Sequence, residues 1–300
     1  MCHSSVVALN VHVPVTVQTA EVASLTEVVE AVASWQQEDA PVQLHPGDLG
    51  WNWSLGAREL AAAVRIWRSG EQIVAVGLVD GVGLIRMGIS PSLDRDESFA
   101  ARLLADLSDP AQGVLSAGNA CVEARFGAAF RGLLTASGWV ADEPWTPLVR
   151  DLADEVEGCD LRVEVVDGHN VSDRVEVQRA AFPNSTFSRA RWQTMAAAPP
   201  YRRARCLVGY DANDNAVAAV TVWSSGPGRP GLLEPLGVHR DHRGRGHGTA
   251  ISLAAAAALK EMGASSATVC TPSSNVGAVA TYASAGFRRI PPVTDFRRAG

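Results

Sequence analysis

Hydrophobic positions along the chain follow two different periods. Short apolar runs, such as 72–79 and 216–223, are typical of strands. Longer stretches in which apolar residues recur three or four positions apart, such as 171–181 and 246–262, are typical of helices. The two kinds of run alternate, with hairpin-linked strands between helices. This order predicts an α+β fold, in which helices cover both faces of a mixed α/β sheet.

The same order of elements is predicted twice. In the first half we expect strands at 11–17, 72–79 and 83–89, with helices from Ser24 and at 56–67. A helix, a strand, a helix and terminal strands follow. In the second half we expect strands at 161–166, 205–209, 216–223, 232–238 and 266–271, helices at 171–181, 188–195, 246–262 and 276–284, and closing strands.

Two landmarks recur at nearly the same spacing. The strands that end at Ile89 and Val238, 149 residues apart, are each followed by a polar turn and a helix. Gly138 and Gly286, each followed by an aromatic residue, are 148 residues apart. Two matches in the same order indicate a duplicated unit of about 150 residues.

The boundary between the units is predicted at an acidic stretch, 151–160, which holds few large apolar residues. A strand-like run restarts directly after it, so we expect one domain at 1–150, a linker at 151–160 and a second domain at 161–300. A chain of 300 residues with 47% hydrophobic content has enough apolar side chains for two modest cores.

Charge and cysteine content narrow the class of protein. A net charge of −6 argues against general nucleic-acid binding. The five cysteines form no CxxC pair, so we expect reduced thiols and neither a disulfide framework nor a metal site. The amino terminus lacks a basic leader, and no run approaches the roughly 20 apolar residues of a membrane span. These features predict a cytoplasmic monomer or homodimer that binds neither membranes nor nucleic acid.

The turn after Val238 has the composition of a pyrophosphate site. Its glycines allow a sharp turn and close approach of the backbone to a ligand. The helix after the turn offers free N–H groups and a positive dipole end, and arginines add cationic donors. The residues concerned are Arg243, Gly244, Arg245, Gly246, His247 and Gly248.

Other interpretations of this turn fit less well. A P-loop needs Gly-Lys-Ser/Thr, which is absent, and a dinucleotide fingerprint needs GxGxxG directly after the strand. The nearby histidines, His239, His242 and His247, are accompanied by arginines and by no recognisable ligand spacing, so a metal site is disfavoured. A surface turn without a ligand stays a less favoured alternative.

The second half resembles the GNAT superfamily of N-acetyltransferases in two motifs. Arg243, Gly246 and Gly248 fill its Arg/Gln-x-x-Gly-x-Gly/Ala motif. The downstream segment resembles the family's Asn-x-x-Ala-x-x-x-Tyr-x-x-x-Gly-Phe sequence, filled by Asn275, Ala278, Tyr282, Gly286 and Phe287. The strong likeness covers about 232–287, and the first half resembles the fold in outline only.

The resemblance implies acetyl-CoA as co-substrate, without a metal. In GNAT folds the fourth and fifth strands diverge, and the pantetheine arm pairs with the free edge of the fourth. The resemblance thus implies cofactor contacts at Leu236, Gly237, Val238, Arg243, Gly244, Arg245, Gly246, His247, Gly248 and Asn275. Asn275 also suits a helix N-cap.

Two residues are expected to carry the chemistry. Tyr282, two helical turns from Asn275, would protonate the departing thiolate; the alternative is a core aromatic. Glu234 would take the proton of the acceptor ammonium; the alternative is a structural carboxylate. Alternation predicts that Glu234, Leu236 and Val238 share one face, and Pro235 predicts a break in the ladder.

The first half is expected to be degenerate and to bind no cofactor. Its corresponding turn, 90–98, has no glycine and is acidic, and Leu134 stands at the tyrosine position. Such tandem arrangements occur in the family, for example in mycothiol synthase, and this likeness of architecture implies no acceptor. We expect the acceptor contacts in the second half at Phe182, Phe187 and Trp192, with 48–53 as the counterpart in the first.

The function expected from the sequence is transfer of an acetyl group from acetyl-CoA to a primary amine. We expect the amine to belong to a small molecule and to attack the thioester directly in a ternary complex. A protein or peptide N-acetyltransferase is a second possibility, and a non-catalytic acyl-CoA-binding sensor a third. The presence of both Glu234 and Tyr282 argues against the sensor.

Overall fold

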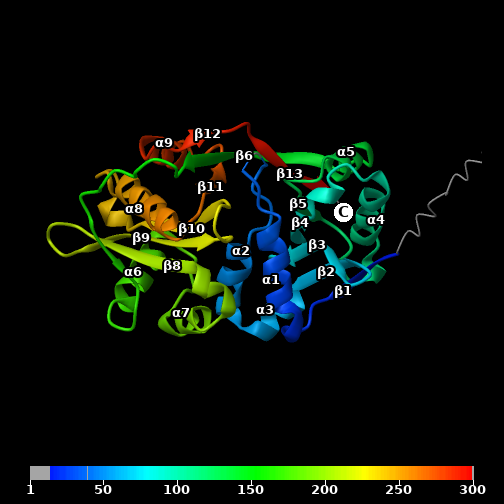
Figure 1. Cartoon of the computed structure of the whole chain (residues 1–300), viewed down its shortest axis with the longest axis horizontal. Coiled ribbons are helices and arrows are strands. Elements are labelled where there is room, and N and C mark those ends of the chain that lie inside the picture. The colour runs from blue at the N-terminus through cyan, green and yellow to red at the C-terminus, as the bar shows by residue number, and fades with distance from the viewer. Residues whose placement is uncertain (1–13, 39, 299–300) are drawn as a thin grey trace, which may run out of the picture.

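The computed structural model describes residues 14–38 and 40–298, and its elements largely follow the predicted order (Figure 1). The first half contains β1 (Val15–Thr19), α1 (Leu25–Ser34), α2 (Pro46–Asn52), α3 (Ala57–Ala63), β2 (Val64–Ser69), β3 (Gln72–Val79), β4 (Leu84–Ile89), α4 (Glu97–Ser108), β5 (Ala120–Glu123), α5 (Ala128–Ala136) and β6 (Val140–Asp151). The second half contains β7 (Arg162–Val165), α6 (Val171–Ala181), α7 (Arg189–Ala196), β8 (Ala204–Tyr210), β9 (Ala216–Ser224), β10 (Gly231–Val238), α8 (His247–Glu261), β11 (Ser266–Pro272), α9 (Val276–Ser284), β12 (Arg288–Arg289) and β13 (Val293–Arg298).

Most predicted elements of the second half are confirmed to within one or two residues, whereas two in the first half differ. Residues 11–13 of the first predicted strand lie outside the described residues. The helix predicted at 56–67 ends at Ala63, and the chain continues as strand β2, paired with β3. Val64 and Ile66 are buried, and β-branched residues at alternate positions favour a strand.

The strands form one continuous mixed sheet, which confirms the predicted α+β class. Their order is β1-β2-β3-β4-β5-β13-β6-β11-β10-β9-β8-β7, with β12 paired to β6. The pairs β4–β5 and β10–β11 are parallel, and the neighbours on either side of them are antiparallel. Separate hydrophobic clusters lie on the sheet in each half.

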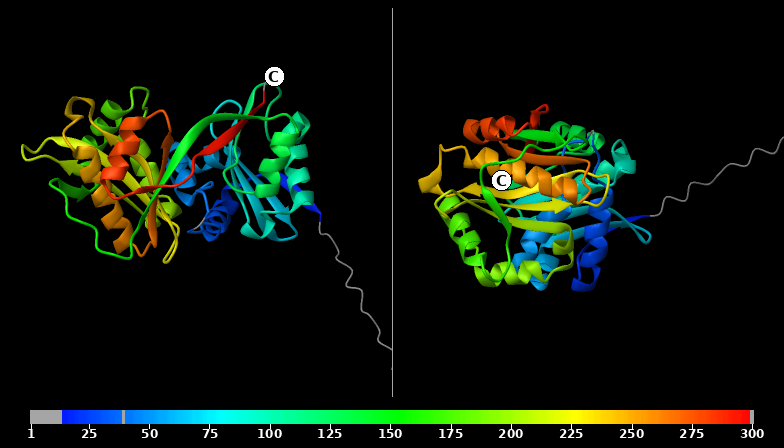
Figure 2. Two further views of the ribbon diagram at one scale, coloured as in Figure 1. Left: turned by 90° about the horizontal axis from the view of Figure 1, so that it is seen from above. Right: turned by 60° about the vertical axis from the view of Figure 1, so that its left-hand side comes forward.

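The closing strands of the two halves are exchanged. The second part of β6 pairs with β11 of the second half, from Trp145 to Asp151. Strand β13, at the end of the chain, pairs with β5 of the first half. Figure 2 shows β6 (green) and β13 (red) crossing between the halves. The sequence offset of 148 maps Trp145 onto Val293, and these two residues pair with each other. An approximate two-fold axis therefore passes between them.

The predicted linker connects β6 to β7 as irregular chain. Lys260 on α8 donates hydrogen bonds to the carbonyls of Leu152, Ala153 and Asp154, which ties the start of this segment to the second half. The division at 151–160 stays a prediction about the sequence repeat, because each half of the sheet contains a strand from the other side of this boundary.

Within the described residues, no helix has the length and apolar character needed to cross a membrane.

Candidate active site

A groove lies where β10 and β11 diverge. The two strands are paired only at Gly231 and Leu232, opposite Ala267 and Thr268. Beyond this point the groove follows β10 to the start of α8 and encloses a cavity of about 590 Å³. It is lined by Leu236, Gly237 and Val238, by the turn before α8, and by Asn275, Ala278 and Tyr282. The divergence of the strands implied by the GNAT resemblance is therefore present.

A bulge interrupts β10 at the predicted place. The pairing with β9 shifts register between Leu233 and Leu236, as expected from Pro235. Leu233, Leu236 and Val238 all pack into the core cluster beneath α8. The prediction that Glu234 shares a face with Leu236 was therefore wrong, because the extra residue of the bulge breaks the alternation.

The glycine-rich turn leaves the amino end of α8 open. Gly246 is the N-cap of α8 and offers no side chain to its N–H groups. Gly244 and Gly246 have positive φ values of 75° and 84°. No atom lies within 4 Å of the position that a Cβ would take at either residue, so the space in front of them is free for a ligand. A backbone cradle of this kind fits the pyrophosphate of a CoA thioester.

The arginines of this turn differ in their contacts. The guanidinium of Arg243 donates to the carbonyl of Ala181 at 2.9 Å, and Arg240 donates to Ala180 at 3.0 Å, so both bind the last turn of α6. Arg245 lies on the surface and donates to the carbonyl of Asp241. Arg243 lines the groove, whereas Arg245 is absent from its lining.

The glycines at 237 and 248 allow close packing. A Cβ at Gly237 would lie 2.6 Å from the Cβ of Ala181, and one at Gly248 would lie 2.8 Å from Thr281.

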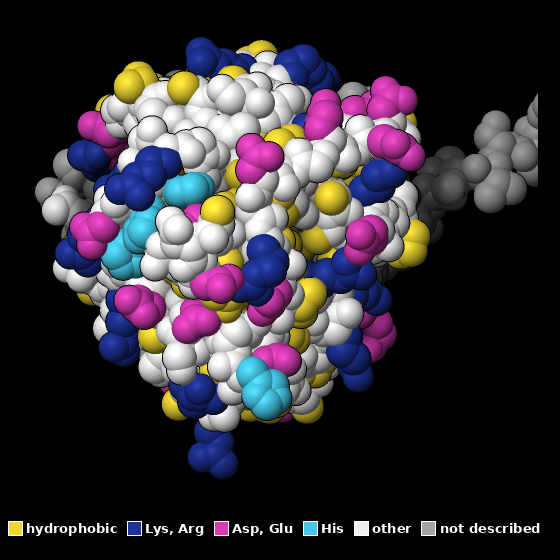
Figure 3. All heavy atoms as spheres, turned by 90° about the vertical axis from the view of Figure 1, so that its left-hand side faces the viewer, with side chains coloured by type: hydrophobic (Ala, Val, Ile, Leu, Met, Phe, Trp, Pro, Cys, Tyr) yellow, Lys and Arg dark blue, Asp and Glu magenta, His cyan; other side chains and the backbone are white. Residues whose placement is uncertain are grey.

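The histidines of the turn cluster on the surface (Figure 3), with the ring centroids of His239 and His242 5.3 Å apart. His247 lines the groove. Among the described residues, no group of three or more His, Cys, Asp or Glu is arranged to hold a metal ion.

Helix α9 carries both Asn275 and Tyr282 into the groove. Asn275 is the N-cap of α9, as predicted, and its side chain accepts from the N–H of Ala278 at 3.2 Å. Tyr282 is buried against Phe287, with ring centroids 5.9 Å apart. Burial, with the negative charge of Glu234, raises the pKa of Tyr282. The phenol therefore keeps its proton throughout the neutral range.

A second cavity, of about 600 Å³, lies between the two halves. The first half contributes side chains from α2, β4 and β5, and the second half contributes the middle of β10 and the exchanged strand β13. Five residues line both this cavity and the groove: Phe182, Leu236, Asn275, Ala278 and Tyr282. The two spaces therefore meet at Tyr282.

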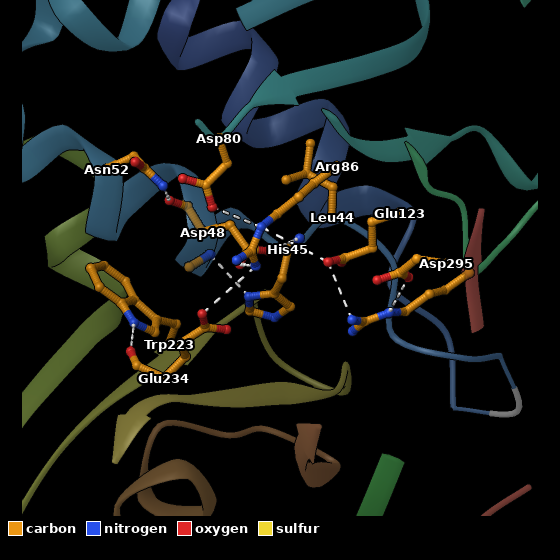
Figure 4. Close-up of polar contacts among 12 residues, drawn as sticks. Leu44, His45, Asp48, Asn52, Asp80, Arg86, Glu123, Trp223, Glu234 and Asp295 are labelled. Atoms are coloured by element: carbon orange, nitrogen blue, oxygen red, sulfur yellow. Dashed lines mark hydrogen bonds and ion pairs between the residues drawn. The ribbon is translucent and has the colours of Figure 1, made fainter. Parts of the chain in front are cut away.

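Glu234 projects into the interdomain cavity toward Arg86 of the first half (Figure 4). Its Oε1 lies 3.7 Å from the Nη1 of Arg86, and 37% of its side-chain surface is exposed, toward the cavity. Burial raises the pKa of Glu234, while the positive charge of Arg86 opposes the shift. A carboxylate with a raised pKa is better matched to accepting a proton near neutral pH.

Asp48 on α2 binds the same guanidinium, and α2 itself packs closely against the second half. Gly47 and Gly50 lie against the ring of Trp223 on β9, where a Cβ would approach to 2.6 Å and 2.3 Å. The indole N–H of Trp223 donates to the carbonyl of Glu234 at 2.7 Å. Asp48 accepts from Arg86 at 3.1 Å, and burial, with the charge of Glu234, raises its pKa to about 7.

His45 fixes the start of α2. Its Nδ1 accepts from the N–H of Gly47 at 2.9 Å, and its Nε2 lies 2.6 Å from the hydroxyl of Ser225 in the second half. Burial lowers the pKa of His45 to about 3, so the ring stays neutral. Because Nδ1 accepts, Nε2 carries the proton and cannot act as a base toward Ser225.

The three predicted acceptor contacts are placed differently. Phe182 lines both the groove and the interdomain cavity. Phe187 is 1% exposed and stacks on Trp51 with centroids 5.0 Å apart, and Trp192 donates to the hydroxyl of Tyr201. Phe187 and Trp192 thus belong to an aromatic cluster between α2 and the second half, and line neither cavity.

Sequence reasoning missed the charged residues that the first half contributes. Arg86 and Glu123 lie within otherwise apolar strands, and a charge at such a position is a signal that could have been followed. Asp295 lies on the last strand and reaches the cavity only because that strand is exchanged. Its pKa is raised to about 6 by burial, which outweighs the lowering effect of Arg125.

In the first half, the chain itself fills the place that corresponds to the groove. The side chain of Gln43 accepts from the N–H of Ile89 at 2.7 Å and donates to its carbonyl at 3.2 Å, and Leu44 N–H donates to Met87. At the amino end of α4, the carboxylate of Asp96 accepts from Phe99 N–H at 2.8 Å. The side-chain amide of Gln43 therefore satisfies the backbone groups of Ile89, and the carboxylate of Asp96 satisfies an N–H group at the amino end of α4.

Comparison with known proteins agrees with this geometry. Residues 173–287 match the family model described as "Acetyltransferase (GNAT) family". The second half of the chain therefore carries a GNAT-family domain over these residues. No curated protein gave a significant match.

Three solved structures are similar over nearly the whole chain. A GCN5-related N-acetyltransferase from Sphaerobacter thermophilus has 15% identity and a TM-score of 0.59, with 95% of each chain covered. A tandem GNAT protein from the clavulanic acid biosynthesis pathway has 17% identity and a TM-score of 0.58, with 95% of this chain and 98% of that chain covered. A GNAT-family acetyltransferase from Colwellia psychrerythraea has 15% identity and a TM-score of 0.61, with 94% and 99% covered. At these identities the likeness establishes the fold, which is that of two GNAT-like units in tandem.

Proposed function

We propose that the chain is an N-acetyltransferase that moves an acetyl group from acetyl-CoA to a primary amine of a small molecule. The observation that carries this proposal is the meeting of two spaces. A groove with an open helix terminus joins an interdomain cavity at Tyr282, and Glu234 lies in the cavity close to that junction. An acyl donor in the groove and an amine in the cavity would thus meet between an acid and a base.

The reaction assigns one proton transfer to each residue. Glu234 takes a proton from the acceptor ammonium, which frees the lone pair. The amine nitrogen attacks the thioester carbonyl, the C–N bond forms, and the C–S bond breaks as the tetrahedral centre collapses. Tyr282 gives its proton to the departing thiolate. The nitrogen releases its second proton to solvent as the amide forms, and Tyr282 is reprotonated from solvent. The phenol carries its proton throughout the neutral range, so it is available as a donor when the thiolate forms.

The shape of the cavity supports a small acceptor over a protein. Its lining combines side chains from both halves of the chain, including Asp48, Arg86 and Asp295, which are mostly buried. An extended peptide needs an open groove along the surface, whereas this cavity is lined by side chains of both halves.

Thiol release from acetyl-CoA across a panel of small amines tests the proposal. Tyr282→Phe should lower kcat by roughly 10²–10⁴ while acetyl-CoA affinity changes little, because only the acid is removed. Tyr210→Phe is the matched control, since Tyr210 binds Asp173 and lines neither cavity. Equal kcat for both variants would remove Tyr282 from the mechanism.

The pH–rate profile tests Glu234. Glu234→Gln should lower turnover most at low pH, where few acceptor amines are already deprotonated, and should leave acetyl-CoA affinity intact. An unchanged profile would assign Glu234 a structural role. Binding of acetyl-CoA without thiol release on any small amine or peptide would favour a non-catalytic sensor, and release on peptides alone would favour a protein acetyltransferase.

A further inference from the structure

A row of alternating charges crosses the interdomain cavity from Glu234 to Asp295 (Figure 4). Arg86 lies 3.7 Å from Glu234 and 3.9 Å from Glu123. Arg125 lies 3.2 Å from Glu123 and 3.6 Å from Asp295. The row begins at the junction with the groove and ends on the exchanged strand β13, in the part of the cavity formed by the first half.

Neither guanidinium in the row is free to bind an anionic ligand. Arg86 also contacts Asp48 at 3.1 Å and Asp80 at 2.9 Å, so four carboxylates surround it. Arg125 contacts two carboxylates and lies over the ring of Trp145, 5.2 Å from its centroid. The cavity lining contains five carboxylates, those of Asp48, Glu123, Asp142, Glu234 and Asp295, and the guanidinium groups of Arg86 and Arg125. Negative charge is therefore in excess.

Asp295 is the member of the row with an unused acceptor. It is 6% exposed and lines the cavity, and its Oδ1 lies 3.6 Å from the Nε of Arg125, which is an ion pair without a hydrogen bond, so this oxygen accepts no hydrogen bond. A buried carboxylate oxygen without a donor is costly, which makes it a strong site for a ligand N–H. The carboxylate of Asp142, in contrast, is bound by Arg297.

We infer that the acceptor is a small molecule with two positive charges. One amine lies at Glu234 and receives the acetyl group, and a second ammonium is held by Asp295 and Glu123 at the opposite end of the row. This inference rests on the proposed function and names its substrate class. The second ammonium keeps its proton and charge during the reaction, so the product carries one positive charge fewer than the substrate.

Matched pairs of amines test this inference. Terminal diamines of three to six carbons are compared with monoamines of equal length, and kcat/KM is measured for each pair. The best diamine should exceed its monoamine by at least about tenfold, because the monoamine brings no hydrogen-bond donor and no second positive charge to Asp295. Equal kcat/KM within every pair overturns the inference.

The variant Asp295→Asn should reduce this preference to nearly one, mainly through a higher KM for the diamine, and leave monoamine kcat/KM within about threefold. Asp106→Asn is the control for a buried carboxyl lost elsewhere in the first half, since Asp106 binds Trp67 and Arg102. If Asp295→Asn does not fold, Glu123→Gln is measured in its place and should likewise reduce the preference for the diamine. An equal loss for both amines would make Asp295 structural and overturn the inference.

Direct binding separates this inference from the proposed function. If no amine supports thiol release although acetyl-CoA binds, the proposed function fails. Calorimetry with the diamine alone then decides the inference. Binding to the unaltered chain that is at least about tenfold weaker in Asp295→Asn supports a dication site, and no binding to the unaltered chain overturns it.

Discussion

Replacing Gly50 by alanine tests whether packing between the halves positions the site. Gly50 is on α2 of the first half and lies against Trp223, which is 1% exposed on β9 of the second. A Cβ at Gly50 would lie 2.3, 2.7 and 2.9 Å from three atoms of the indole ring. Carbon atoms in contact normally lie about 3.5–4.0 Å apart, so either α2 or the ring must move.

The expected magnitude combines two opposing effects. Overpacking a well-packed core costs typically about 1–3 kcal/mol. Alanine in place of glycine within a helix contributes about 0.5–1 kcal/mol in favour of the variant. Since three atoms of a buried ring are too close, we expect the upper part of the overpacking range and a net loss of about 1–2 kcal/mol. The matched control is Gly132→Ala in α5, where no atom lies within 4 Å of the added Cβ, so only the gain of about 0.5–1 kcal/mol applies.

Urea unfolding of both variants measures these changes, and steady-state kinetics in native buffer measures their effect on the site. Movement of Trp223 would disturb the hydrogen bond from its indole to the carbonyl of Glu234, so Gly50→Ala should also lower kcat. Gly132→Ala should leave kcat unchanged. If Gly50→Ala is as stable as Gly132→Ala, the packing argument is refuted. A stability loss with unchanged kcat would refute the coupling to Glu234.

Three further predictions concern pH, the exchanged strands and the turn. The fold raises the pKa of Asp48 to about 7 and so favours its protonated form. The contribution of this group to stability is complete below pH about 4 and is lost as pH rises through 7. Asp48→Asn should therefore reduce the fall in unfolding free energy between pH 5 and 8, and an unchanged slope would contradict the pKa shift. A chain that begins at residue 152 lacks the strand paired with β11 and leaves β13 without partners, so it should not unfold cooperatively as a monomer in thermal circular dichroism. Gly246→Ala should weaken acetyl-CoA binding in calorimetry by about three- to tenfold, because φ is 84° there, whereas Gly228→Ala, at a φ of 68° outside the groove, strains the backbone without altering affinity.

The second half was predictable in detail because its signals are local. The turn at 243–248, the N-cap at Asn275 and the break at Pro235 are each set by residues close together in the sequence, through φ preferences, capping and the missing N–H of proline. Helix α9 spans the predicted residues. Where two local preferences competed, as between helix and strand at Val64, the pairing with β3 decided the outcome.

The sequence by itself determined the repeat, the open helix terminus and most of the residues predicted to line the groove, because these follow from spacing and backbone chemistry. Only the tertiary structure decided how the first half takes part. It brings Asp48 and Arg86 to Glu234, and the exchanged strand brings Asp295 to the same cavity. These contacts join residues more than a hundred positions apart, and no local preference encodes them. They depend on the packing of α2 against Trp223 and on a strand exchange that pairs Trp145 with Val293.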